Sequence, residues 1–220
     1  MTRTSESLFF RRWVLACGAA EFLGIGAAGV VAGLTLYWIG EPTTIAEKIG
    51  VLAAMVAAGS VEGWLVGAFQ AGVLVEKIPN LSRAAWIRAT MLVAAAGWFL
   101  GMLPSTLLSG SQVSDPQPVQ VEPSLWVVAL AAVGMGLVLG AIFGWAQQRV
   151  LRRYVSGSSR WIVANSLAWG AGLWWVYLGA SWPDGSEPIW QIMLSAVVSG
   201  VLMGLTVGVV TGLFLKKMLR

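Results

Sequence analysis

The sequence has no histidine and only one cysteine, Cys17. The lack of histidine removes the commonest metal ligand, the usual general base at neutral pH and the usual axial ligand of haem. A single cysteine excludes an intramolecular disulfide and a zinc cluster. No nucleophile–base pair, phosphate-binding loop or metal motif appears, so we expect neither enzymatic activity nor a cofactor.

Charged residues are also scarce. They make up 11% of the 220 residues, whereas 57% are hydrophobic, and a soluble domain carries about 25% charged residues. A water-facing surface cannot be built from this composition. The 27 glycines and 13 tryptophans suit close helix packing in lipid and rings anchored at the headgroup level. The sequence therefore predicts an all-α integral membrane protein.

Long apolar runs define the expected membrane spans. About 20 apolar residues are needed to cross the hydrocarbon layer. Six segments meet this length, roughly 13–38, 50–74, 86–108, 124–148, 161–181 and 189–215. We expect them to form one transmembrane domain over residues 1–220.

The charges predict the orientation of these six spans. One side collects thirteen basic residues: Arg3, Arg11, Arg12, Lys77, Arg83, Arg88, Arg149, Arg152, Arg153, Arg160, Lys216, Lys217 and Arg220. The opposite loops carry Glu41, Glu47, Asp115, Glu122, Asp184 and Glu187, with Lys48 as their one basic residue. Cytoplasmic loops are the ones enriched in Lys and Arg. We expect a multi-pass protein of the cell (inner) membrane with both termini cytoplasmic.

The odd-numbered spans share one sequence pattern. Each begins at a tryptophan (Trp13, Trp86 or Trp161), followed by alanine three residues on, a small polar residue four on and glycine eleven on. The small polar residues are Cys17, Thr90 and Asn165.

The even-numbered spans share a second pattern, three glycines spaced four residues apart and then a polar residue. The glycines are Gly59, Gly63 and Gly67, then Gly136, Gly140 and Gly144, then Gly200, Gly204 and Gly208; the polar residues are Gln70, Gln147 and Thr211. Such a glycine zipper lets a neighbouring helix approach closely in lipid. Together the two patterns predict three helix hairpins, at about 11–79, 83–155 and 160–220, around a pseudo-threefold axis.

A resemblance rests on the middle of the chain. Residues 140–152 (GAIFGWAQQRVLR) and 160–170 (RWIVANSLAWG) resemble repeats of uncharacterised multi-pass membrane proteins from cyanobacteria and other phototrophic or filamentous bacteria. The shared hairpin pattern is GxxxGxxxGxxQxxVL, and the resemblance is sharpest from 136 to 172. It implies a multi-pass bacterial membrane protein and no particular activity.

Two acidic residues lie inside expected spans, Glu21 and Glu62. A charge at the centre of a span costs roughly 2.5–3.5 kcal/mol, so such residues are functional candidates. The repeat places Ala94 and Trp169 at the positions of Glu21, and Leu139 and Met203 at those of Glu62. Two carboxyl groups in contact would share one proton, which suits a proton or cation site. The alternative is that each is neutral or hydrogen-bonded and only fixes helix packing.

A second set of polar residues lies near the cytoplasmic ends of the spans. We expect one polar layer containing Gln70, Gln147, Thr211, Cys17, Thr90 and Asn165. It either hydrogen-bonds the hairpins together or forms a polar constriction or headgroup site.

Tryptophans near expected span ends are interpreted as interface anchors; they are Trp13, Trp38, Trp86, Trp126, Trp161, Trp182 and Trp190. The deeper ones either line an apolar pocket or pack against glycine faces; they are Trp64, Trp98, Trp145, Trp169, Trp174 and Trp175.

Two functional hypotheses remain open. The first is a small transporter, channel or substrate-binding membrane subunit that binds its substrate or ion at Glu21 and Glu62. The second is a non-catalytic scaffold or accessory subunit of a larger membrane complex that binds lipid or pigment. The expected partners are the lipid bilayer and either another membrane protein or further copies of this chain. We attribute the excess of basic over acidic residues to loops that lie beside anionic lipid, so we do not expect the protein to bind nucleic acid.

Overall fold

The structure is a computed structural model that describes residues 3–108, 124–182 and 187–219. Every regular element in these ranges is an α-helix. The six helices are α1 (Arg3–Ile39), α2 (Ile45–Leu74), α3 (Arg83–Leu108), α4 (Leu125–Leu151), α5 (Arg160–Ser181) and α6 (Ile189–Met218). Asp115, Glu122, Asp184 and Arg220, which contribute to the predicted orientation, lie outside the described residues.

Local chemistry sets the helix ends. Gly40, with φ +69°, follows α1, and its N–H donates to the Leu36 carbonyl, since glycine adopts this left-handed conformation without strain. Thr44 begins α2 with a capping box. Its hydroxyl accepts from the Glu47 N–H at 3.2 Å, and the Glu47 carboxylate accepts from the Thr44 N–H at 2.9 Å. The helices follow the expected spans closely, except that α1 begins well before residue 13.

Five of the six helices are long and apolar enough to cross a membrane: α1, α2, α3, α4 and α6. Helix α5 has 22 residues but is less apolar. It carries Asn165, Ser166 and four tryptophans, and indole rings count little toward hydropathy. Sequence and structure thus agree on six helices and differ on how clearly the fifth qualifies as a span.

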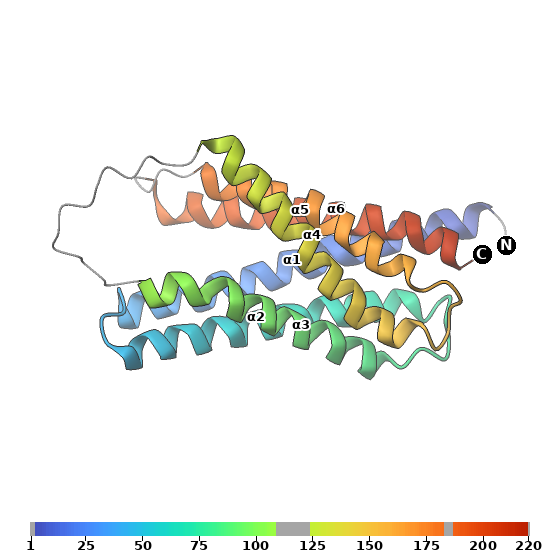
Figure 1. The fold of residues 1–220 in the computed structure, drawn as a ribbon, viewed down its shortest axis with the longest axis horizontal. Coiled ribbons are helices and arrows are strands. Elements are labelled where there is room, and N and C mark those ends of the chain that lie inside the picture. The colour runs from blue at the N-terminus through green and yellow to red at the C-terminus, as the bar shows by residue number, and fades with distance from the viewer. Residues whose placement is uncertain (1–2, 109–123, 183–186, 220) are drawn as a thin grey trace.

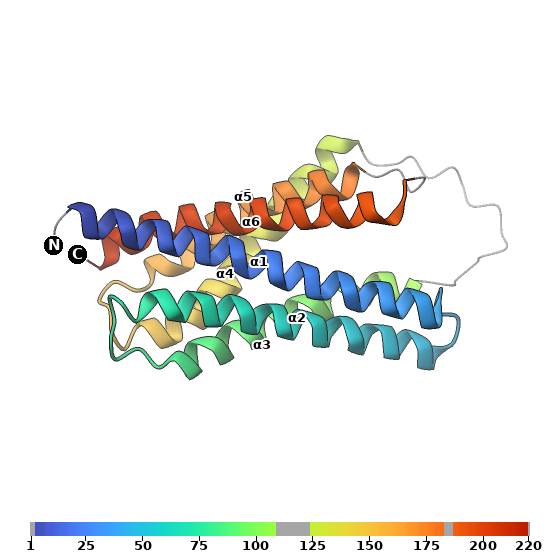
Figure 2. The same ribbon diagram turned by 180° about the vertical axis from the view of Figure 1, so that it is seen from behind.

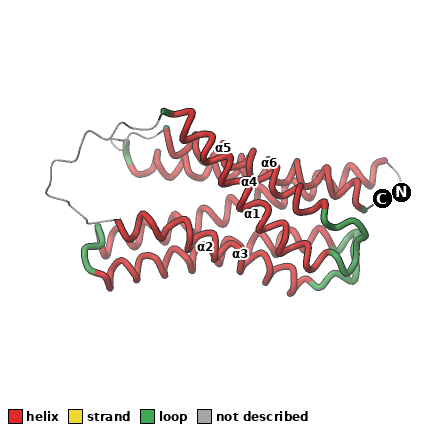
Figure 3. Tube along the Cα trace, in the orientation of Figure 1, coloured by secondary structure: helices red, strands yellow, loops and turns green. Residues whose placement is uncertain are grey.

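The helices form an elongated bundle with both termini at one end (Figures 1 and 2). The loops joining α2 to α3 and α4 to α5 lie at the same end, and the α1–α2 turn lies at the opposite end (Figure 3). We call the first of these the basic end; it comprises both termini and loops 75–82 and 152–159. The exposed arginines Arg83, Arg152 and Arg153 lie there, whereas Lys48 follows the α1–α2 turn.

The helices close into a ring in chain order, with α6 against α1. Helices α3 and α4 touch each other least among neighbours. The three regularly spaced glycines of each even helix pack against the next odd helix around the ring: α2 against α3, α4 against α5 and α6 against α1. A Cβ on Gly67, Gly144 or Gly208 would lie 2.9, 2.7 or 2.8 Å from the Cα of Ile87, Ile162 or Val14, respectively. Any larger residue at these positions would force the two backbones apart.

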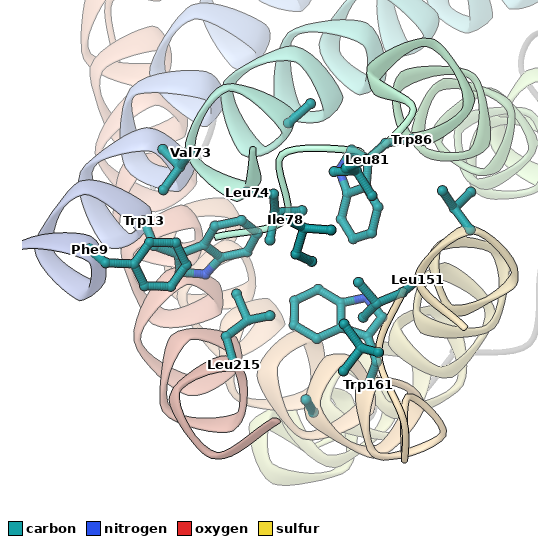
Figure 4. Packing of buried hydrophobic residues seen from close by; sticks show 14 of the residues in the cluster. Phe9, Trp13, Val73, Leu74, Ile78, Leu81, Trp86, Leu151, Trp161 and Leu215 are labelled. Carbon is teal, nitrogen blue, oxygen red and sulfur yellow. The ribbon is translucent and has the colours of Figure 1, made fainter. Parts of the chain in front are cut away.

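Three tryptophans form the centre of the core near the basic end. Trp13, Trp86 and Trp161 are fully buried, and the Trp161 ring lies 6.0 Å from Trp13 and 5.9 Å from Trp86, centroid to centroid. Figure 4 shows the three rings converging with the leucines of the even helices, Leu74, Leu151 and Leu215, which are also fully buried. We call Trp13, Trp86 and Trp161 the tryptophan layer.

The interpretation of these three residues as interface anchors is therefore wrong. They lie at span ends, as anchors do, but on the inner face of the bundle. Each indole N–H has a polar partner inside the protein, described below, so the ring need not reach the headgroups to satisfy it. The other end residues Trp38, Trp126, Trp182 and Trp190 are exposed, as anchors require.

Candidate functional site

Each ring of the tryptophan layer donates its N–H to the polar residue that follows the glycines of a neighbouring helix. Trp86 Nε1 donates to Gln70 Oε1 at 3.3 Å, and Trp161 Nε1 donates to Gln147 Oε1 at 2.9 Å. Trp13 Nε1 donates to Thr211 Oγ1 at 2.9 Å. These bonds join α3 to α2, α5 to α4 and α1 to α6. The same pairing thus occurs at three different helix contacts.

The six residues of the expected polar layer are all buried, and four of them form one connected network. Gln147 Nε2 donates to Gln70 Oε1 at 3.1 Å and to Thr90 Oγ1 at 2.9 Å. Gln70 Nε2 in turn donates to Cys17 Sγ at 3.7 Å. Side chains from α1, α2, α3 and α4 therefore meet here.

The other two members of the layer are satisfied mainly by the backbone. Asn165 Nδ2 donates to the Trp161 carbonyl at 3.0 Å, and the Thr211 hydroxyl donates to the Val207 carbonyl at 2.5 Å. Asn165 nevertheless lines the same cavity as Cys17, Gln70 and Gln147. Thr211 accepts from Trp13, which belongs to the tryptophan layer.

The two glutamates lie together, one from α1 and one from α2. Both side chains line the same small interior cavity. Glu62 Oε2 also accepts a 2.6 Å hydrogen bond from Trp98 Nε1 of α3. Glu21 is 6% exposed, and its Oε2 has no hydrogen-bonding partner among the described residues. We call Glu21 and Glu62 the acidic pair.

A glycine of a neighbouring helix makes room for each side chain at this site. A Cβ on Gly204 would lie 2.5 Å from Glu21 Cγ, and a Cβ on Gly24 would lie 2.5 Å from Glu62 Cγ. Gly59 faces the Trp98 ring in the same way. Gly24, Gly59 and Gly204 thus make room for large side chains between helices, where a β-carbon would exclude them.

A small interior cavity connects the acidic pair with the polar layer. Its lining includes Cys17, Glu21, Glu62, Gln70, Gln147 and Asn165, together with apolar residues such as Ala94, Phe143 and Val207. Its volume is about 20 Å³, which holds about one water molecule. The two sets of residues that the sequence suggested separately therefore line a single cavity.

Sequence reasoning missed the specific role of Trp98, which it grouped with the other deep tryptophans. A signal was present. Trp98 follows Trp86 by twelve residues, and the repeat pattern aligns it with Ile25 and Leu173. Trp98 is therefore a departure from the pattern, as Glu21 and Glu62 are, and the three departures meet at one place.

The chemistry of the site suits a very small ligand. Two carboxyl groups and one indole donor can hold a proton, a water molecule or a small cation, and an organic substrate does not fit in about 20 Å³. The described residues contain no group of three or more His, Cys, Asp or Glu side chains arranged to hold a metal ion. Comparison of the chain with protein-family models, with curated protein sequences and with solved structures found no match.

Proposed function

We propose that all six helices span the cell (inner) membrane, with both termini in the cytoplasm. Helix α5 is about 33 Å long at 1.5 Å per residue, which is enough for a hydrocarbon layer of about 30 Å. It lies between α4 and α6 in the ring, both of which qualify as spans. The gathering of arginines at the basic end supports a cytoplasmic position for that end.

The six helices form three related hairpins around a pseudo-threefold axis in this proposal. Its support is the recurrence of the same tryptophan-to-polar hydrogen bond at three helix contacts. At each of the same three contacts, a glycine also lies close to the Cα of the residue just after the tryptophan: Val14, Ile87 or Ile162.

The proposed function is that of a small transporter, channel or substrate-binding membrane subunit whose ion site is the acidic pair. One observation carries this proposal: Glu21, buried inside a membrane span, presents an unpartnered oxygen beside a cavity that also reaches Glu62. A carboxyl group kept only for packing would be expected to have both oxygens satisfied. The size of the cavity limits the transported or bound species to a proton or a small cation.

The tryptophan layer suggests the side from which the site is reached. Its three rings and the leucines Leu74, Leu151 and Leu215 are fully buried and separate the cavity from the basic end. Helices α3 and α4 touch each other least, and the first residues of α4, Leu125 and Trp126, are exposed. Entry from the end opposite the basic end, beside α3 and α4, follows from this arrangement.

Flux measurements on the full chain in lipid vesicles test the proposed function. Purified protein is reconstituted, a pH gradient with a potassium-diffusion potential is imposed, and internal pH and sodium are followed with entrapped dyes. We expect flux above that of protein-free vesicles, lost when Glu21→Gln and Glu62→Gln are combined. Flux that survives the double substitution would rule out the acidic pair as the ion site. No flux above protein-free vesicles would rule out transport.

The second candidate function is a membrane scaffold or accessory subunit. It is favoured by the small volume of the cavity and by three glycines of α3 and α4, Gly97, Gly101 and Gly134, which have open space beside them. A glycine with no neighbour on its side of the helix lets a helix of another protein pack closely against it in lipid. Native mass spectrometry of gently extracted protein tests this candidate. A co-purifying membrane protein of fixed stoichiometry supports it, and a lone chain contradicts it.

A further inference from the structure

We propose that the acidic pair is a one-proton site, with the proton on Glu21 and the negative charge on Glu62, and that it takes a proton in preference to a metal cation. This inference names the ligand of the site described above and so rests on the proposed function for its physiological meaning. The geometry that carries it belongs to the resting protein and requires no flux.

The small cavity that the two carboxyl groups share requires one proton. Glu21 and Glu62 line a space of about 20 Å³, which holds about one water molecule. Among the described residues, no basic side chain lines this cavity to offset a second negative charge. Two carboxyl groups that share such a site hold one proton, because two like charges at that distance cannot both persist.

Trp98 decides which glutamate holds the proton. An indole N–H is a donor and cannot accept, so Glu62 Oε2, at 2.6 Å from Trp98 Nε1, acts as an acceptor. Glu21 Oε2, by contrast, has no hydrogen-bonding partner among the described residues. A hydrogen bond to the charged form of a carboxyl group favours that form, so the negative charge lies on Glu62 and the proton on Glu21.

Other groups around the cavity do not compete for this proton. The one further titratable side chain in the lining is the Cys17 thiol of α1, which accepts from Gln70. Helices α3, α4, α5 and α6 contribute no titratable side chain to the lining: their residues there are Ala94, Phe143, Gln147, Asn165, Trp169, Gly204 and Val207.

A metal cation fits the site poorly. Hard cations need about six or more oxygen ligands, and the cavity of about 20 Å³ leaves space for about one water. The amide oxygens nearby are already in use. Gln70 Oε1 accepts from Trp86 and Gln147, and Gln147 Oε1 accepts from Trp161. The Trp98 N–H would also face any cation bound at Glu62 Oε2.

Infrared spectroscopy of the full chain in phosphatidylcholine–phosphatidylglycerol vesicles at pH 7 tests the inference. A protonated carboxyl group has a C=O stretching band separate from that of a carboxylate. We expect one such band in the wild type. It should disappear in Glu21→Gln, because Glu62 then has no second carboxyl group beside it in the cavity lining and its charge is stabilised by the Trp98 N–H. It should persist, at a shifted position, in Glu62→Gln.

Glu76→Gln is the matched control, since it removes a carboxyl group on the exposed surface, and its band should equal that of the wild type. A missing band in the wild type would overturn the one-proton site. A band that is lost in Glu62→Gln or only in the double variant would overturn the assignment of the proton to Glu21. Trp98→Phe keeps both glutamates and removes only the donor, so it serves if Glu21→Gln does not fold. Its band should shift, and an unchanged band would overturn the role of Trp98.

Titration with sodium, potassium or calcium chloride, against choline chloride, tests the preference for a proton. We expect the band to stay constant, and a band that falls with one of these cations would overturn the preference. The vesicle flux experiment separates the two proposals. If the wild type shows the protonated-carboxyl band but no flux, the one-proton site stands and the proposed transport is ruled out. If the wild type shows flux but no band, transport stands and the one-proton site is ruled out.

Discussion

The tryptophan layer and the acidic pair lie next to each other in the bundle but are built on different principles. The layer uses the same residue type three times, and each ring makes the same bond to a neighbouring helix. The acidic pair consists of two glutamates, one of which accepts from Trp98. Each of these three residues stands where the other repeat units have apolar residues. The repeated bonds of the tryptophan layer indicate that it holds the helices together. The residues of the acidic pair depart from the repeat, which indicates that they are retained for chemistry at a cost in stability.

Trp161→Ala breaks the repeated layer and should have the largest effect on stability. Trp161 is fully buried, contacts both other rings and donates to Gln147. Loss of a buried tryptophan costs about 3–5 kcal/mol. Unfolding in mild detergent, followed by tryptophan fluorescence and circular dichroism, measures it. Trp64→Ala is the control, because that ring is half exposed and its loss should cost far less.

Gly144→Leu tests the close helix contacts beneath the layer. Its Cβ would lie 2.7 Å from Ile162 Cα, which is backbone and cannot move aside, so we expect a loss of about 1–3 kcal/mol. Gly101→Leu is the control, since nothing lies within 4 Å of its Cβ position. Thermal unfolding of the two variants in the same detergent compares them. Equal melting temperatures would contradict the close contact between α4 and α5.

Trp98→Phe tests whether the hydrogen bond from Trp98 to Glu62 contributes more to stability than a hydrogen bond to a neutral acceptor. We expect a loss of about 1.5–3 kcal/mol, because hydrogen bonds to charged groups are worth more than neutral ones. Trp175→Phe is the matched control: Trp175 Nε1 donates at 2.9 Å to the neutral Thr206 hydroxyl, a bond worth about 0.5–1.5 kcal/mol. Similar losses in chemical unfolding would argue that Glu62 is uncharged.

Glu21→Gln combined with Glu62→Gln should have the smallest effect on stability. Glutamine keeps the shape of each side chain and removes the need to bury a charge, so we expect stability within about 1 kcal/mol of the wild type or above it. Ion flux in vesicles should nevertheless be lost. A double variant that unfolds readily would show that the acidic pair holds the bundle together, as the tryptophan layer does.

Much of this architecture is predictable from local patterns. Hydropathy places the helices, because length and apolar composition decide which segments suit lipid. The repeat patterns single out Gln70, Gln147 and Thr211 as related positions and mark Glu21 and Glu62 as exceptions. Trp98 is an exception of the same kind at the twelfth residue after each tryptophan, where the other two units have Ile25 and Leu173.

Other features depend on which face of a helix turns inward. Trp13, Trp86 and Trp161 have the sequence signature of interface anchors, and only their partners inside the bundle show that they are core residues. The glycine pattern indicates close packing, but it does not say which helix approaches. In the structure Gly204 faces Glu21 and Gly24 faces Glu62.

The sequence by itself determined the helical class, the apolar segments, the recurring residues and the two carboxyl groups within them, because composition and spacing act along the chain. Only the tertiary structure decided that those carboxyl groups line one water-sized cavity together with residues of the polar layer, and that Trp98 donates to one of them. Contacts between residues far apart in the chain depend on how the helices rotate and approach, and a single sequence carries no direct record of that geometry.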